Sequence, residues 1–160
     1  MATRLSHELT YEASLDAVSA MLADPAFREE VCRHQHAVTF SVAVEGEADA
    51  PQVRIESTQA TDRVPAFAKK FIGETTTIVW SESWSRPRRA EVSIAIPGKP
   101  GEIRGTATLD EVDGVTTETV DLQIKVKIPL VAGKIEELLA KLMRSALRAE
   151  HRAGQAWLTR

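Results

Sequence analysis

The sequence has little that would suit an exported, membrane-spanning or disulfide-stabilised protein. Cys32 is the only cysteine among 160 residues, so an intrachain disulfide is impossible and nothing indicates an oxidising compartment. The first ten residues include Arg4, His7 and Glu8 where a signal peptide would have an unbroken apolar stretch. The longest strongly apolar run, residues 37–44, contains two polar residues and is far shorter than the ~18 residues of a membrane span. We therefore expect a cytoplasmic protein.

Several motifs for cofactor binding and catalysis are also missing. The chain has neither G-x-x-x-x-G-K-[ST] nor G-x-G-x-x-G, the glycine-rich loops that hold phosphates, so we expect no cofactor. No serine lies in a G-x-S-x-G turn, and Cys32 has no recognisable catalytic partner motif. His34 and His36 lie two residues apart without a third ligand nearby, whereas a zinc site needs about three protein ligands, so we predict no metal. The net charge of -3 argues against nucleic-acid binding, which depends on Lys and Arg neutralising phosphates.

What the sequence does contain is enough apolar residues, 43% of the chain, to form the core of one domain spanning residues 1–160. Residues 3–11 alternate between apolar and polar side chains, which predicts a half-buried strand. Ser14 is a typical cap for a short helix, and Asp24 followed by Pro25 predicts the start of a second helix.

Further alternating runs predict six more strands, which follow one another through short turns that suit antiparallel pairing. A short helix between Pro65 and Gly73 interrupts them and is a candidate gate for a cavity. Asp113-Gly114 is the best hairpin signal, because glycine supplies the positive φ that a type I′ turn needs. The predicted strands include residues 38–44, 53–57, 75–84, 92–96, 103–109 and 120–128.

The chain ends in a long amphipathic helix, predicted over residues 130–157 and about 40 Å long at ~1.5 Å per residue. The order of elements predicts an α+β fold, in which a curved antiparallel sheet of about seven strands wraps around this helix. Its apolar stripe is predicted to comprise Ile135, Leu138, Leu142, Met143, Ala146, Ala149, Ala153 and Trp157.

Two segments carry a resemblance to a known superfamily: residues 127–157, KIPLVAGKIEELLAKLMRSALRAEHRAGQAW, and residues 64–73, VPAFAKKFIG. With the order of elements, they resemble the START-like (SRPBCC, helix-grip) superfamily, and within it a bacterial branch with no established function. That superfamily includes lipid-transfer domains, polyketide cyclase and dehydrase-like proteins, and plant allergen-type hydrophobic carriers. The resemblance implies a ligand cavity between the sheet and the terminal helix.

Two polar side chains are candidates for chemistry in such a cavity. His7 shares a strand face with Leu5, Leu9 and Tyr11, where it is either a hydrogen-bonded core histidine or an acid or base. Glu82 lies between Trp80 and Trp84, and burial against their rings would raise the pKa of its carboxyl. The alternation does not orient strand 75–84, and we favour the outward orientation, in which Glu82 stays solvated and the two tryptophans cover a rim or a dimer contact.

Two further features have a functional and a structural interpretation. Glu118 makes the apolar face of the last strand polar at one end, which indicates either a polar cavity mouth or, as we favour, fraying beside the turn. A basic stripe on the terminal helix is either a solvated outer face, which we favour, or a transient contact for an anionic membrane. That stripe comprises Lys141, Arg144, Arg148 and Arg152.

These observations favour a protein that binds or carries a hydrophobic small molecule, such as a lipid, isoprenoid or polyketide-like compound. One alternative is a cyclase or dehydratase-like enzyme that uses His7 or Glu82 as acid or base; another is an interaction module whose cavity has closed. The sequence determines neither the ligand nor the oligomeric state. The candidate cavity residues are His7, Leu9, Tyr11, Phe67, Phe71, Trp80, Glu82, Trp84, Leu138, Leu142, Met143 and Ala146.

Overall fold

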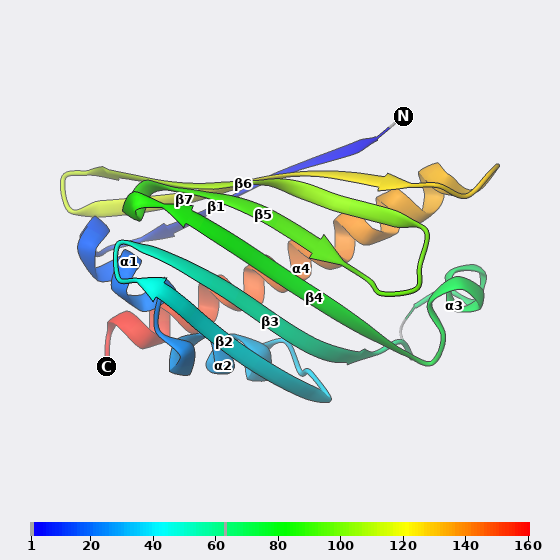
Figure 1. The fold of residues 1–160 in the computed structure, drawn as a ribbon, viewed down its shortest axis with the longest axis horizontal. Helices are drawn as coiled ribbons and strands as arrows, with labels where there is room; N and C mark the ends of the chain where they lie inside the picture. Colours follow the sequence, from blue (N-terminus) through cyan, green and yellow to red (C-terminus); the bar gives the residue numbers. More distant parts are fainter. Residues whose placement is uncertain (1, 63) are drawn as a thin grey trace.

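The computed structural model describes residues 2–62 and 64–160, except for the side chains at positions 71 and 87. The predicted α+β architecture is confirmed: a seven-stranded antiparallel sheet curves around a long C-terminal helix (Figure 1). The elements are β1 (Thr3–Tyr11), α1 (Leu15–Leu22), α2 (Pro25–His34), β2 (Thr39–Glu47), β3 (Ala50–Ala60), α3 (Ala66–Ile72), β4 (Thr75–Ser85), the short 3₁₀ turn η1 (Arg86–Arg88), β5 (Arg89–Ala95), β6 (Gly101–Val112), β7 (Val115–Val126) and α4 (Ala132–Leu158).

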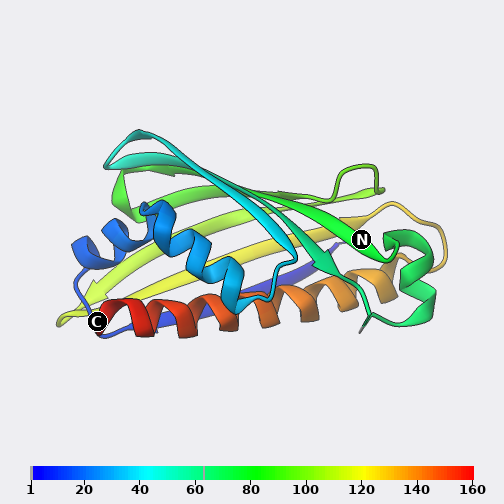
Figure 2. The same cartoon turned by 90° about the horizontal axis from the view of Figure 1, so that it is seen from below.

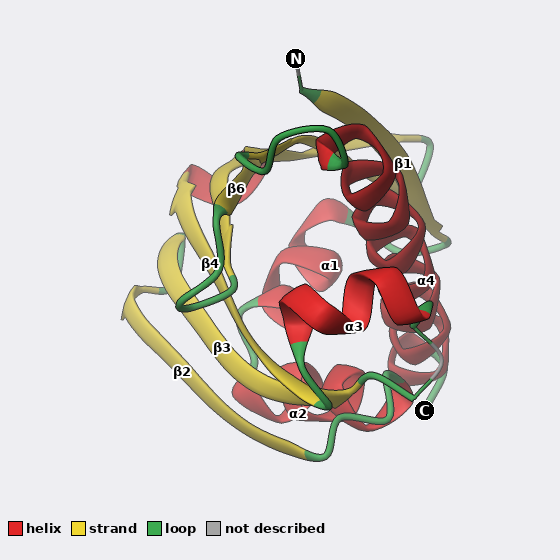
Figure 3. Ribbon diagram, turned by 90° about the vertical axis from the view of Figure 1, so that its right-hand side faces the viewer, coloured by secondary structure: helices red, strands yellow, loops and turns green. Residues whose placement is uncertain are grey.

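The strand order places the first and second strands at opposite edges of the sheet. The order is β1-β7-β6-β5-β4-β3-β2, and every neighbouring pair is antiparallel. Helices α1 and α2 connect the two edge strands and pass below the sheet, beside α4 (Figure 2). Seen end-on, the sheet forms an open trough with α4 along one side, α2 at the bottom and α3 near one end (Figure 3).

Local sequence signals explain where several elements begin and turn. The Ser14 hydroxyl accepts a hydrogen bond from the Ala17 amide at 3.1 Å, and the Asp24 carboxylate accepts one from the Ala26 amide at 2.9 Å. These side chains satisfy amides that a helix start leaves unpaired. Asp113 and Gly114 adopt φ angles of 52° and 78°, as a type I′ hairpin requires.

Helix α4 buries part of the predicted stripe, namely Ile135, Met143, Ala149 and Ala153, but not all of it. Leu138 is only half-buried and Leu142 is 38% exposed, whereas Leu139 and Leu147 are buried. The prediction followed apolar residues alone, but the buried face of α4 also contains glutamates that the fold uses. The carboxylate of Glu136, for example, accepts hydrogen bonds from the Thr3 hydroxyl at 2.8 Å and the Val126 amide at 2.9 Å. Neither α4 nor another helix of the described residues is apolar enough over a sufficient length to cross a membrane.

Candidate ligand-binding cavity

A cavity of about 300 Å³ lies between the concave face of the sheet and α4. Strands β3 and β4 contribute Ile55, Ile78 and Trp80, while α4 contributes Met143 and Ala146. Helix α2 closes one side with its C-terminal half, and α3 contributes to one end. A smaller apolar space of about 50 Å³ adjoins the cavity, since both are lined by Ile72, Ile96 and Leu139. The enclosed space therefore continues toward the N-terminal end of α4.

A larger hollow, of about 760 Å³, lies on the outer face of the sheet and has a different character. Its lining includes Arg54, Ser81, Glu91, Arg104 and Asp121, whose side chains alternate with the inward-facing ones. Charged and hydroxyl groups on an open sheet face remain hydrated, and several of these charges pair with neighbours on the same face, such as Asp121 with Arg4. The smaller space beneath α4 is the better candidate, because small-molecule sites are mostly apolar and largely enclosed.

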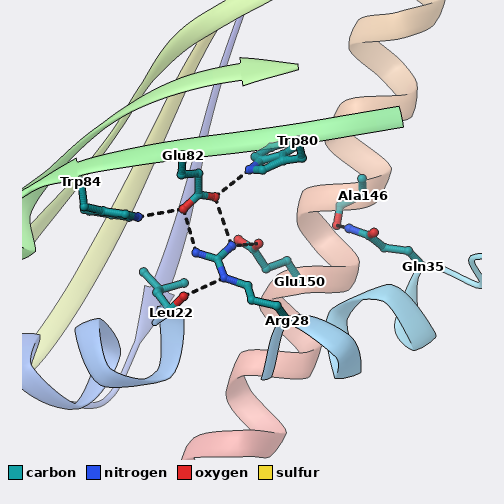
Figure 4. A network of polar contacts seen from close by, with 8 residues as sticks. All are labelled: Leu22, Arg28, Gln35, Trp80, Glu82, Trp84, Ala146 and Glu150. Carbon is teal, nitrogen blue, oxygen red and sulfur yellow. Dashed lines mark hydrogen bonds and ion pairs between the residues drawn. The ribbon is translucent and has the colours of Figure 1, made fainter. Parts of the chain in front are cut away.

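A buried network of charged and aromatic side chains lies beside the cavity (Figure 4). Glu82 of β4 accepts hydrogen bonds from Arg28 of α2 through both oxygens: from Nη2 to Oε1 at 2.7 Å and from Nη1 to Oε2 at 3.1 Å. The indole N–H groups of Trp84 and Trp80 donate to the same two oxygens at 2.9 and 2.7 Å. The Arg28 Nε also donates to the Leu22 carbonyl at 2.7 Å. This network fixes α2 against β4.

The electrostatics of Glu82 correct the prediction made from its aromatic neighbours. Burial does raise the pKa of this carboxyl, but the charge of Arg28 and hydrogen bonds from Arg28 and the two tryptophans lower it by more, so the net pKa is lowered. Glu82 is therefore a carboxylate at neutral pH. For Arg28, burial favours the neutral guanidine, yet Glu82 and Glu150 raise its pKa above the ordinary value. Both members of the pair stay charged.

Two further glutamates, Glu150 and Glu118, face this pair but have no comparable set of hydrogen-bond donors around them. Glu150 of α4 lies 3.6 Å from Arg28 Nη1, and burial raises its pKa from 4.5 to about 7 despite the attraction of Arg28. Glu118 of β7 is 2% exposed, and burial, together with the charges of Glu150 and Glu82, raises its pKa well above the ordinary value. The fraying favoured for Glu118 is therefore wrong, since its strand is paired on both sides and its side chain is buried.

The phenol of Tyr11 completes this group, which we call the carboxylate cluster: Arg28, Glu82, Glu118, Glu150 and Tyr11. Burial and then the charges of Glu150 and Glu118 raise the pKa of Tyr11, so it stays neutral. Among the described residues, no hydrogen-bond partner reaches the Tyr11 hydroxyl or Glu118 Oε1. Buried polar groups are usually paired, so unpartnered ones mark a place suited to water or a ligand.

The structure brings part of the predicted site together. Trp80, Leu142, Met143 and Ala146 line the cavity, with Leu142 at its partly exposed rim. Strand β4 turns its Trp-Glu-Trp face toward the interior, so the outward orientation favoured from the sequence is wrong. Glu82, Trp84 and Tyr11 lie in or beside the carboxylate cluster and not on the cavity wall.

The other predicted residues lie elsewhere. Leu9 is fully buried in the core, while Phe67 and Leu138 line a separate groove on the outer side of α4 with Lys141 and Arg144. Phe67 is 41% exposed, and the side chain of Phe71 lies outside the described residues. The predicted residues therefore divide between the cavity, the core and the surface.

His7 faces α4, as predicted, but not the cavity. It is half-buried, and its pKa is lowered by burial and then by the charges of Arg148, Arg144 and His151. Its imidazole is therefore beside the basic outer stripe of α4. The histidine pair of the sequence analysis, His34 and His36, lies near the cavity rim at the end of α2. Within the described residues, no group of three or more metal-ligating side chains is placed to hold a metal ion.

Sequence reasoning missed the two residues that define the cluster, Arg28 and Glu150. Arg28 lies between Phe27 and Val31 on the buried face of α2. From the sequence alone, a single charged residue at such a position is expected to be exposed to solvent. Glu150 follows Met143 and Leu147 at helical spacing, so a search for polar residues on the inner stripe of α4 would have found it.

A comparison with family models identifies the sequence family. Residues 6–158 match the model of the family described as "Protein of unknown function (DUF2505)". The chain belongs to this family. Among curated proteins, none has a sequence that matches this DUF2505 member significantly.

Solved structures confirm the START-like fold. A START superfamily protein from Mycobacterium smegmatis shares 11% identity, with a TM-score of 0.60 over 96% of this chain and 98% of that one. Norcoclaurine synthase from Thalictrum flavum shares 14% identity, with a TM-score of 0.64 over 99% and 87% of the two chains. The di-domain ARO/CYC protein StfQ from the steffimycin biosynthetic pathway shares 10%, with a TM-score of 0.68 over 98% of this chain and 50% of that one. At these identities the likeness concerns the fold alone.

Proposed function

We propose that this DUF2505 protein binds a hydrophobic small molecule in the cavity between β3, β4, α2 and α4. The observation that carries the proposal is the space of about 300 Å³ beneath α4, which is lined mainly by apolar side chains such as Ile55, Ile78, Trp80 and Met143. This volume is at the lower end of the range for small-molecule sites, roughly 300–1,000 Å³. It favours a compact isoprenoid or polyketide-like compound over a long acyl chain.

The rim of the cavity suggests a route for exchange. Leu142 is 38% exposed there, and the exposed Arg152 lines the cavity farther along α4. Arg152 also belongs to the basic stripe, whose other members, Lys141, Arg144 and Arg148, lie on the outer side of α4. We propose that this stripe contacts an anionic membrane transiently during loading or release, since each basic residue near such a surface contributes about 1 kcal/mol.

A dye titration with a cavity-filling variant tests ligand binding. Prodan, a small neutral naphthalene dye, should bind with a rise in fluorescence, and Ala146→Trp should abolish this signal because the indole fills the space beside Met143. Ala156→Trp is the matched control: it adds the same side chain to an exposed position of the same helix, so binding should persist. Circular dichroism would establish that both variants are folded.

Two outcomes would contradict the proposal. If wild-type protein leaves the dye signal unchanged and also fails to bind isoprenoid and polyketide-like compounds, the cavity does not serve as a binding site. If the dye binds equally to wild type and folded Ala146→Trp, it binds elsewhere, and the cavity loses the support of this assay.

The position of Glu150 favours one second candidate, an acid/base enzyme acting on a molecule in the same cavity. Its carboxyl lines the cavity and has a pKa of about 7, close to the value at which a general acid or base is most effective. The sequence candidates fit less well, because Glu82 is held by Arg28 and two tryptophans, and His7 lies outside the cavity. Turnover of a bound cyclisable compound, with a pH profile that Glu150→Gln abolishes, would support this function; binding without turnover would contradict it.

A further inference from the structure

The carboxyl of Glu150 is an unfilled acceptor in the cavity wall. The side chain is 8% exposed and lines the cavity, yet no described residue donates a hydrogen bond to it. Its one charged contact is Arg28 Nη1 at 3.6 Å, longer than the ~2.7–3.2 Å of an N–H···O hydrogen bond. A buried carboxyl normally has donors around it, so this position can accept one from a molecule in the cavity.

Arg28 neutralises Glu150 only in part, because its guanidinium is paired at shorter distances with Glu82. Its Nη1 and Nη2 donate to the two oxygens of Glu82, and its Nε donates to the Leu22 carbonyl. The bidentate pair balances one positive charge with one negative charge. Glu150 and Glu118 are then left without a cation of their own, and the pKa of each is raised.

The groups that face Glu150 come from every element packed around it. Arg28 approaches from α2, Glu82 from β4, Glu118 from β7 and the neutral Tyr11 from β1. Farther out, His34 and Arg152 line the same cavity. One cation therefore faces three carboxyl groups in this cluster, and of these only the carboxyl of Glu150 lines the cavity. An anionic ligand there would be repelled by the carboxylates, whereas a cationic ligand would supply the positive charge that the cluster lacks.

Resting on the proposed binding function, we propose that the cavity takes an apolar molecule bearing a protonated amine, which Glu150 binds as a carboxylate, and that it excludes apolar carboxylates. The amine supplies both the hydrogen-bond donor that Glu150 lacks and the positive charge that the cluster lacks. The apolar remainder of the molecule lies against Trp80, Ile78 and Met143. The ligand class is thus a hydrophobic amine and not a fatty acid.

Three compounds with the same apolar part and different head groups test this selectivity. In NMR titrations at pH 7.5, 4-phenylbutylamine should bind at least about tenfold more tightly than 4-phenylbutanol. The reason is that a charge-assisted hydrogen bond contributes more binding free energy than a neutral one. The third compound, 4-phenylbutanoate, should bind most weakly. Glu150→Gln should reduce amine binding to within about twofold of the alcohol while leaving alcohol binding unchanged.

Glu137→Gln is the matched control, since it removes a carboxylate from an exposed position of the same helix and should preserve the preference for the amine. If the alcohol or the carboxylate binds as tightly as the amine, the inference is wrong while the binding function stands. If the preference survives in Glu150→Gln, the amine is recognised elsewhere and the inference is also wrong. If none of the three compounds binds and Prodan does not bind either, the proposed function itself fails together with the inference.

Discussion

Replacing Glu150 by Gln should make the protein more stable at neutral pH, although it removes a charged contact with Arg28. Burial raises the pKa of Glu150 from 4.5 to about 7, even though Arg28 opposes the change. The folded protein therefore prefers the neutral carboxylic acid at this position. Glutamine has nearly the same shape as that neutral form and does not ionise.

The linkage between protonation and folding gives the magnitude and the sign. A pKa raised from 4.5 to about 7 corresponds to roughly 3 kcal/mol, at about 1.4 kcal/mol for each tenfold change in proton affinity. This stabilising contribution of wild-type Glu150 is fully present below about pH 4.5 and is lost as the pH rises through about 7. Glu150→Gln should thus match wild type at pH 4.5 and exceed it by about 3 kcal/mol at pH 7.5. The charge of Glu150 also raises the pKa of Glu118, so replacing Glu150 should lower the pKa of Glu118.

Urea unfolding at several pH values, followed by tryptophan fluorescence and circular dichroism, measures this difference. Glu137→Gln, at an exposed position of α4, is the control and should show no comparable pH-dependent gain. A Glu150→Gln protein that is less stable than wild type at pH 7.5 would refute the reasoning. It would mean that the contact between Glu150 and Arg28 stabilises the fold by more than the burial of the carboxylate costs.

Three further predictions concern the packing around the same network. Arg28→Met should lower the free energy of unfolding by about 3–5 kcal/mol at pH 7, because it leaves the buried Glu82 carboxylate without its cation; a loss below about 1 kcal/mol in urea unfolding would contradict this. Gly154→Ala should be less stable than Gly133→Ala by about 1–2 kcal/mol in thermal or urea unfolding, because a Cβ at 154 would lie 2.5 Å from a Tyr11 ring carbon while nothing lies within 4 Å at 133; equal stabilities would contradict the close packing. Tyr11→Phe should be neutral or stabilising by up to about 1 kcal/mol, because it removes a buried hydroxyl that has no partner among the described residues; a loss above about 1 kcal/mol would show that the hydroxyl is hydrogen-bonded.

The fold could be predicted from the sequence because its signals are local. Strand alternation at residues 3–11, the caps at Ser14 and Asp24, and the Asp113-Gly114 turn each depend on neighbouring residues, and each has the predicted structure. The long terminal helix was also predictable from its periodicity. Its buried stripe was predicted less well, because a helix enclosed by a curved sheet buries polar residues that the fold can satisfy.

The site was harder to predict because it depends on contacts between distant residues. Arg28 and Glu82 are 54 positions apart, and neither sequence neighbourhood shows that the other is nearby. That pairing reverses the direction of the pKa change expected for Glu82 from its tryptophan neighbours. The pKa values of Glu118 and Glu150 are raised by burial, and the charge of Glu150 raises that of Glu118 further, which depends on the packing of β7 against α4.

The central claim is that the space beneath α4 holds an apolar molecule, and native mass spectrometry of gently purified protein tests it most directly. The account predicts one small apolar molecule per chain, bound either from the purification or after incubation with isoprenoid, polyketide-like or phenylalkyl compounds. Ala146→Trp should lose this added mass, and Ala156→Trp should keep it. Wild-type protein that stays free of every compound, or a folded Ala146→Trp that binds as well as wild type, would contradict the account.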